Sequence, residues 1–145
     1  MRQIKRIFIH CTASWKTATV NDIKAEFAKK GWKNPGYHYL VDYAGKIHQL
    51  LSEDKVSNGV KGYNATAINV AYIGGITNNG EKIVTADTRT PEQKAGLISI
   101  LSVLKKKYPN AIIMGHRDIW GEDPKKWQKQ CPCFDAKEEY KNIYL

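Results

Sequence analysis

Short runs of apolar, largely β-branched residues recur along the chain and restrict the folds that are open to it. Residues 4–10, 68–76 and 111–114 are runs of this kind, and their lengths suit buried strands better than helices. Residues 37–42 and 46–50 predict two further strands, which a tight turn joins into a β-hairpin. The chain therefore contains at least five segments that are expected to enter a sheet.

Helical segments are predicted between these strands. Residues 21–30 have the apolar spacing of a helix, and Gly31 supplies its stop. The clearest helix starts at Thr90, where Thr-Pro-Glu-Gln combines an N-cap, a proline in the first turn and a capping box. It should extend to about Tyr108, and residues 134–144 predict a terminal helix. The alternation predicts an α/β fold, with a central mixed β-sheet flanked by α-helices.

The length of 145 residues is enough to bury a core without covalent staples. No internal repeat or linker divides the chain, so residues 1–145 are expected to form one domain. No apolar run approaches the roughly 18 residues of a membrane helix, and the first apolar run is too short for a signal peptide. We therefore expect a protein made in the cytoplasm without membrane insertion.

Two apolar runs end in histidine, namely His10 and His116, and long irregular stretches follow both. Long loops in a compact domain are usually functional, so a cleft is predicted at this end of the sheet. Near the C-terminus, Cys131 and Cys133 offer thiols. Two imidazoles and one thiolate are a typical Zn²⁺ ligand set, and three protein ligands leave a fourth position open for water. The pattern indicates a hydrolytic metal site.

The cysteines differ in what they can contribute. There are three in all, and an odd number in an unsecreted chain argues against a disulfide framework. Cys11 follows His10 directly, and successive strand side chains point to opposite faces, so Cys11 is expected to be a small buried residue. In an extended stretch Cys131 and Cys133 would point the same way, and either thiol could reach the metal.

A formal net charge of +9 suggests an anionic partner or a need for solubility in a charged setting. Most of the lysines fit solvated helix faces. Nucleic-acid binding would require a basic stripe with interleaved aromatic residues; residues 120–129 come closest, but no nucleic-acid-binding motif accompanies them. An anionic cell wall would attract the same charge through its long-range field.

The chain also resembles the zinc-dependent N-acetylmuramoyl-L-alanine amidases, a family that includes phage amidase lysozymes and peptidoglycan recognition proteins. The matching segments follow the family's order and cover nearly the whole chain. They are Ile9-His10-Cys11-Thr12-Ala13-Ser14, Gly31-Trp32, Gly36-Tyr37-His38-Tyr39, Lys61-Gly62-Tyr63-Asn64, Ile73-Gly74-Gly75-Ile76, Thr90-Pro91-Glu92-Gln93, Gly115-His116-Arg117-Asp118 and Lys129-Gln130-Cys131-Pro132-Cys133-Phe134-Asp135.

The resemblance implies a role for several of these residues. It selects Cys131 as the ligand that joins the two histidines, and it implies catalytic roles for Tyr37 and Lys129. Lysine suits an oxyanion, and tyrosine can orient water or relay a proton. Thr12 and Asn64 match substrate-contacting positions more weakly. The implied metal set is His10, His116 and Cys131.

Other positions stay open or depart from the family. His38 is expected to be structural or to contact a metal ligand without binding the metal itself. Asp118 or Asp135 is a candidate acceptor for the second ring nitrogen of a ligand histidine. Many relatives carry a Ser-x-His-Ala-Gly-like stretch before Gly-Tyr-Asn, whereas residues 57–61 of this chain read Ser-Asn-Gly-Val-Lys. Substrate contacts from this loop are therefore not carried over.

The implied function is zinc-dependent cleavage of the amide between N-acetylmuramic acid and L-alanine in bacterial peptidoglycan. A chain without signal peptide or wall-binding module resembles a phage or prophage endolysin that is released to the wall; recycling of wall fragments inside the cell is a second setting. We expect a monomer. The alternatives are a non-catalytic peptidoglycan-binding protein of the same fold and a basic zinc protein that binds nucleic acid.

Overall fold

The computed structural model describes residues 2–143 and contains a five-stranded mixed sheet in the order β3-β2-β4-β1-β7. Four strands run parallel, and β3 is antiparallel to β2, so the predicted hairpin is confirmed. The strands are β1 (Arg6–Cys11), β2 (Tyr39–Val41), β3 (Ile47–Gln49), β4 (Ala67–Tyr72) and β7 (Ile112–Gly115). The predicted central mixed sheet is therefore confirmed.

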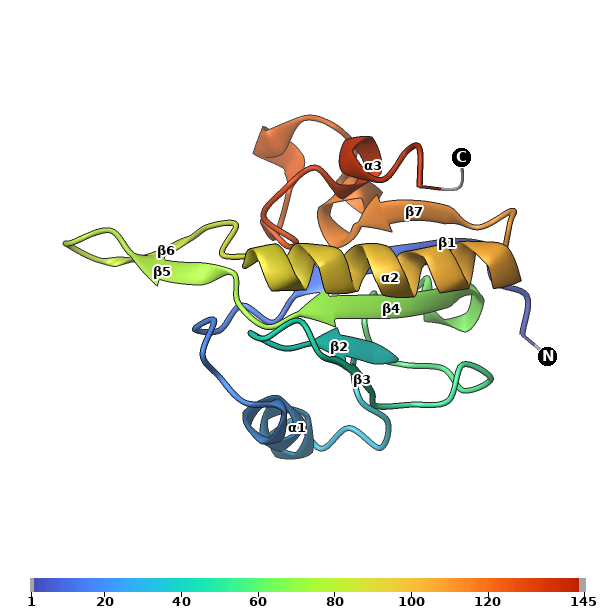
Figure 1. The fold of residues 1–145 in the computed structure, drawn as a ribbon, viewed down its shortest axis with the longest axis horizontal. Helices are drawn as coiled ribbons and strands as arrows, with labels where there is room; N and C mark the ends of the chain where they lie inside the picture. The colour runs from blue at the N-terminus through green and yellow to red at the C-terminus, as the bar shows by residue number, and fades with distance from the viewer. Residues whose placement is uncertain (1, 144–145) are drawn as a thin grey trace.

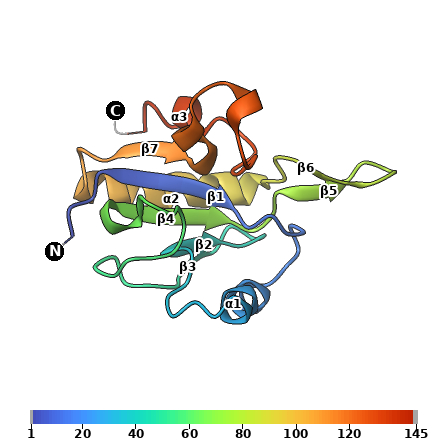
Figure 2. The same cartoon turned by 180° about the vertical axis from the view of Figure 1, so that it is seen from behind.

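Helices α1 (Val20–Lys29) and α2 (Pro91–Lys107) cover opposite faces of this sheet (Figures 1 and 2). Along β4, Val70 packs in the cluster under α2, whereas its neighbour Ala71 packs with Ile23 and Phe27 of α1. This follows from the alternation of side chains along a strand. The capping box at Thr90 is present as predicted, and residues on both faces of the central strands are buried.

The predicted strand over residues 68–76 is wrong beyond Tyr72. Gly74 and Gly75 adopt φ values of +147° and +104°, which only glycine adopts readily, and the chain leaves the sheet there. It continues as a separate hairpin of β5 (Ile76–Asn78) and β6 (Ile83–Thr85), which projects from the body of the molecule (Figure 1). The sequence reading did not anticipate this hairpin.

The predicted terminal helix over residues 134–144 is wrong in its extent. The helix α3 spans only Ala136–Glu139, and the Asp135 side chain caps its N-terminus; position 144 lies outside the described residues. Short 3₁₀ turns punctuate the predicted loops: η1 (Asn64–Thr66), η2 (His116–Trp120) and η3 (Pro124–Lys126). Within residues 2–143, no helix combines the length and apolar character needed to cross a bilayer.

Candidate metal centre and active-site cleft

The two predicted ligand histidines lie side by side because their strands are parallel neighbours. In the register of β1 and β7, Ile9 pairs with Gly115, so the residues that follow them, His10 and His116, meet at the carboxyl ends of the two strands. Their Nδ1 atoms are 3.3 Å apart. The register of the sheet therefore brings together two side chains that are 106 positions apart in the chain.

Cys131 completes the cluster from the loop that precedes α3. Ligand atoms of His10, His116 and Cys131 all lie within 4.8 Å of one another. The backbone N–H of Cys11 donates to the Cys131 sulfur at 3.1 Å, which fixes the sulfur against the end of β1. Two imidazoles and a thiol at this separation have the composition of a three-ligand metal site.

The protonation of the two imidazoles also fits a metal site. Burial lowers the pKa of His10 to about 4. Burial, with the neighbouring His10 and the positive charge of Lys129, lowers the pKa of His116 to about 3. Both rings are therefore neutral near pH 7, the form in which histidine binds metals. Two neutral nitrogens that face each other at 3.3 Å are the arrangement that a shared cation needs.

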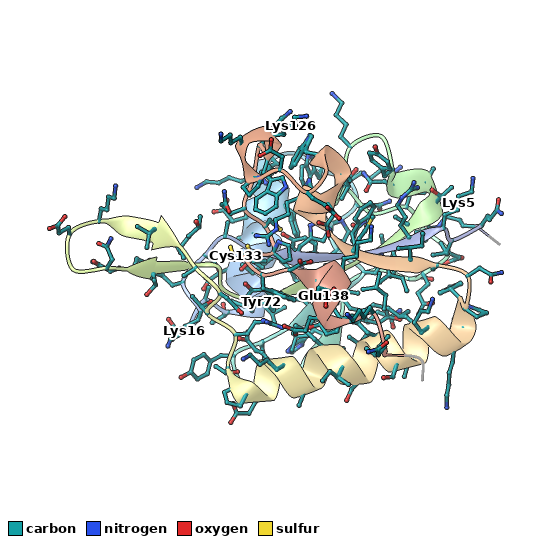
Figure 3. The ribbon with its side chains drawn as sticks, turned by 90° about the horizontal axis from the view of Figure 1, so that it is seen from above. Lys5, Lys16, Tyr72, Lys126, Cys133 and Glu138 are labelled. Carbon is teal, nitrogen blue, oxygen red and sulfur yellow. The ribbon has the colours of Figure 1, made fainter. Side chains whose placement is uncertain are left out.

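Cys131 and Cys133 do not point the same way, so the expectation that either thiol could reach the metal is wrong. Cys133 has a φ of +74°, and this left-handed residue breaks the extended geometry that the expectation assumed. Its sulfur lies 3.8 Å from that of Cys11, and Figure 3 shows Cys133 beside Tyr72. Hydrogen bonding with the Cys131 sulfur raises the pKa of Cys11 to about 12, and Cys11 is buried as predicted.

A cleft of about 510 Å³ opens above the cluster. Its floor and walls include most of the residues predicted from the sequence, together with two tryptophans. They are His10, Thr12, Trp32, Tyr37, His116, Trp127, Lys129 and Cys131. The predicted cleft at this end of the sheet is confirmed, and its volume falls within the ordinary range for small-ligand sites.

Tyr37 stands beside the metal cluster with its hydroxyl protonated. Its ring centroid is 5.2 Å from that of His10, and its hydroxyl lies 3.4 Å from the carbonyl oxygen of Cys11. Burial, with the nearby sulfurs of Cys131 and Cys11, raises the pKa of the Tyr37 phenol well above its usual value. The side chain is half-buried and lines the cleft. It is therefore available to a bound molecule as an O–H donor.

Lys129 lines the same cleft. It is exposed and lies two residues before Cys131 in the loop after η3. Its positive charge contributes to the lowered pKa of both His10 and His116, so it lies near the imidazole pair. A cation at this position can interact with negative charge that develops in the cleft.

The two predicted substrate contacts differ in position. Thr12 lines the cleft, although its hydroxyl already bonds Ser14 and accepts from the Gly74 N–H at 3.0 Å. Asn64 is not among the cleft-lining residues. Its side-chain oxygen accepts from the Val60 N–H at 2.7 Å, which stabilises the loop before β4. Contact of Asn64 with substrate stays a prediction.

The suggested acceptors behind the metal ligands are wrong. Asp118 accepts from the Gly115 N–H at 2.7 Å, and Asp135 caps α3, so both satisfy backbone groups at turns. His10 instead contacts Asn69, with 2.7 Å between its Nε2 atom and the amide oxygen. The sequence reading missed Asn69, although a polar residue inside the apolar run Ala-Ile-Asn-Val-Ala-Tyr is a usable signal.

Trp127 is a second residue that the sequence reading left unassigned. Its ring stacks under the Arg117 guanidinium, 4.0 Å from the ring centroid, and its indole N–H donates to the Gly121 carbonyl. These contacts fix an aromatic face on one wall of the cleft. A tryptophan in a Lys-rich loop carries no local signal of that placement.

Fold and site together define a class: an α/β protein with a central mixed sheet, whose cleft lies over a histidine–histidine–cysteine cluster suited to a metal ion. The model of the N-acetylmuramoyl-L-alanine amidase family matches residues 1–134. The chain therefore belongs to the N-acetylmuramoyl-L-alanine amidase family. Its activity is hydrolysis of the amide between N-acetylmuramic acid and L-alanine in bacterial peptidoglycan.

Relatives of known name agree with this family. The chain is 33% identical to an endolysin of Klebsiella phage KP32 over 94% of this chain and 85% of that protein. It is 32% identical to the endolysin of Escherichia phage T7 over 90% of this chain and 82% of that protein. The two alignments thus cover at least 90% of this chain and more than four-fifths of each endolysin.

Solved structures share the fold. N-acetylmuramoyl-L-alanine amidase LysC from Clostridium intestinale URNW superposes with a TM-score of 0.72 at 27% identity, over 95% of this chain and 82% of that one. Bumblebee PGRP-SA superposes with a TM-score of 0.73 at 17% identity, over 98% of this chain and 83% of that one. The second similarity concerns the fold alone.

Proposed function

We propose that the amidase is zinc-dependent and that His10, His116 and Cys131 hold the ion. The observation that supports this most directly is the convergence of their three ligand atoms within 4.8 Å at the floor of the cleft. The neutral state of both imidazoles favours metal binding over protonation. The chemistry that zinc supplies in such a site is a water made nucleophilic near neutral pH and a polarised carbonyl.

The protein's own side chains supply the remaining steps. Lys129, a cation that lines the cleft, is proposed to stabilise the oxyanion that forms when the amide carbonyl is attacked. The Tyr37 O–H, held beside His10, can orient the attacking water or pass a proton to the departing amine of L-alanine. Thr12 borders the same cleft and is proposed to contact substrate. Charge stabilisation and proton transfer are thus assigned to different side chains of one cleft.

We further propose that residues 1–145 act as one catalytic domain and as a monomer that needs no nucleic acid. The setting that fits best is that of an endolysin, made in the cytoplasm and active on the wall after release. The net charge of +9 supports retention on an anionic wall. No specific observation favours the nucleic-acid alternative, and the amidase family assignment replaces the purely binding one.

The test is to incubate purified protein with peptidoglycan and measure new L-alanine amino termini, with and without a chelator. We expect release that the chelator abolishes and that added Zn²⁺ restores. Release that persists in the metal-depleted protein would overturn the zinc proposal. Release only from soluble fragments, with none from intact wall, would overturn the endolysin setting and support recycling.

A further inference from the structure

We propose that Asn69 is a positioning residue for the metal centre. Its amide oxygen keeps a proton on Nε2 of His10 and so turns the lone pair of Nδ1 toward His116 and Cys131. The proposal rests on the proposed zinc site and adds to it a residue that acts through His10 without touching metal or substrate. It assigns a purpose to a polar side chain at the centre of the sheet.

The register of the sheet explains why these two residues meet. In the pairing of β1 with β4, Asn69 lies opposite Phe8 and His10 opposite Ala71, so the two side chains are diagonal neighbours on one face. Asn69 is fully buried and His10 is 2% exposed. Their contact of 2.7 Å is short and shielded from water, and a buried polar group without such a partner would be costly.

The direction of this hydrogen bond follows from its chemistry. An amide oxygen only accepts, so the His10 Nε2 atom must carry the hydrogen. A neutral imidazole carries a single N–H hydrogen, and the contact with Asn69 places it on Nε2. Nδ1 is then unprotonated, and it is this atom that faces His116. Asn69 therefore selects the tautomer that can bind a metal through Nδ1.

The orientation of the Asn69 amide is itself fixed by a backbone group. The Val60 N–H donates at 2.7 Å to the side-chain oxygen of Asn64, which identifies that atom as an acceptor. The Asn69 amide nitrogen lies 3.4 Å from the same oxygen. A flipped Asn69 would place two oxygens against each other there. The Val60 N–H thus determines, through Asn64, which end of the Asn69 amide faces His10.

Ser57 and His38 hold the other side of the amide. The Asn69 amide nitrogen donates to the Ser57 hydroxyl at 2.7 Å, and that hydroxyl contacts His38 Nδ1 at 3.2 Å. The Asn69 backbone N–H donates to the same His38 nitrogen at 3.1 Å, and His38 Nε2 donates to the Lys55 carbonyl at 2.7 Å. His38 and Ser57 are fully buried, so the chain of contacts is shielded from water.

Gly59 leaves the space that the amide needs. A Cβ atom at this position would lie 2.3 Å from the side-chain oxygen of Asn69. Gly59 belongs to the loop of residues 57–61, which precedes η1. The loop before β4 therefore supports the metal centre indirectly: Ser57, Gly59 and Asn64 position Asn69, and Asn69 positions His10.

The matched pair of variants is Asn69→Leu and Asn69→Asp. Leucine keeps the volume and removes the acceptor, whereas aspartate keeps an oxygen toward His10 and allows the Ser57 hydroxyl to donate to the other oxygen. The probe is Zn²⁺, with its dissociation constant measured by competition with a chelator. We expect Asn69→Leu to weaken binding by roughly 10- to 100-fold, the usual effect of losing such a partner. Asn69→Asp should restore part of the affinity, because it keeps the acceptor for His10 but places its second oxygen against that of Asn64.

A second measurement needs no variant. Nitrogen-15 NMR of the imidazoles in the metal-free wild-type protein reports the tautomer of His10, and we expect a proton on Nε2. A His10 ring protonated on Nδ1 would overturn the proposal, even if Asn69→Leu failed to fold. Unchanged zinc affinity in a folded Asn69→Leu protein would also overturn it.

These outcomes are distinct from failure of the zinc site itself. If wild-type protein bound no zinc, the proposed function would fail before Asn69 was tested. If wild-type protein bound zinc and Cys131→Ser did not, while Asn69→Leu bound it normally, the metal centre would stand and only the positioning role would fall. Gly59→Ala, which crowds the Asn69 amide, should shift the affinity in the same direction as Asn69→Leu.

Discussion

The polar groups at the two ends of the parallel strands differ in whether they have partners within the protein. At the carboxyl ends, His10, His116 and Cys131 converge with neutral nitrogens facing one another under an open cleft. At the amino ends, Arg2 and Glu53 form the centre of a cluster in which the charged side chains make hydrogen bonds and an ion pair within the protein. The Arg2 guanidinium donates to the carbonyls of Glu53 and Ala67.

The Glu53 carboxylate at that end is equally engaged. It accepts from the hydroxyls of Tyr39 and Tyr108 and pairs with Lys107 at 3.1 Å. These contacts tie β2, α2 and the loop after β3 together. One end of the sheet thus satisfies its polar groups internally, whereas the other keeps ligand atoms directed at a shared point. Catalytic activity should therefore depend on the carboxyl end, and resistance to unfolding should depend on the amino end.

The largest effect should come from the choice of thiol at the carboxyl end. Cys131→Ser removes a proposed ligand and should reduce zinc binding and amidase activity by more than the roughly 100-fold expected for an outer partner. Cys133→Ser is the matched control, because its sulfur faces Cys11, and it should largely keep both. Zinc binding is measured as metal content, and amidase activity is measured as release of L-alanine amino termini. Equal loss in both variants would mean that both sulfurs serve the metal.

Lys129→Ala should have the next largest effect. Removing a positive charge that stabilises an oxyanion typically lowers kcat by about 100- to 1,000-fold, whereas zinc content should stay at the wild-type level. Lys126→Ala is the control, because Lys126 is an exposed lysine of η3 in the same loop and does not line the cleft. Figure 3 labels this residue. Full turnover by Lys129→Ala would remove the oxyanion role.

The histidine pair predicts how metal-free protein responds to acid. His10 has a pKa of about 4 when folded and about 6.5 when unfolded, so the unfolded chain binds more protons between these values. Its contribution to stability is complete above pH 6.5 and is lost as the pH falls toward 4. The loss is on the order of 3 kcal/mol. Urea unfolding at successive pH values measures it, and a wild-type profile no steeper than that of His10→Phe would contradict the assignment.

The smallest effect is expected at the amino end. Glu53→Gln weakens charged hydrogen bonds with Tyr39, Tyr108 and Lys107, and should lower the free energy of unfolding by about 1–3 kcal/mol. Its kcat should not change, because the cluster lies at the end of the sheet away from the cleft. Glu81→Gln, at the exposed tip of the β5–β6 hairpin, should change neither quantity. A large drop in kcat for Glu53→Gln would show that the two ends are not separable.

Local signals in the sequence predicted the elements that depend on few neighbours. The capping box at Thr90 and the hairpin of β2 and β3 follow from adjacent residues, and both are confirmed. The break after Tyr72 was missed because Ile73 and Ile76 flank the two glycines and continue the apolar pattern. Backbone conformation at Gly74 and Gly75 overrides that pattern.

Local patterns predicted which ligand atoms are available and that they lie at strand ends, because an apolar run that ends in histidine places this residue where the strand stops. The tertiary structure decided which atoms meet. Sheet register brings His10 to His116, and the left-handed backbone of Cys133 turns its thiol away. Asn69 becomes the partner of His10 through the pairing of β1 with β4. These pairings depend on contacts between residues far apart in the chain, and local residue patterns do not predict such contacts.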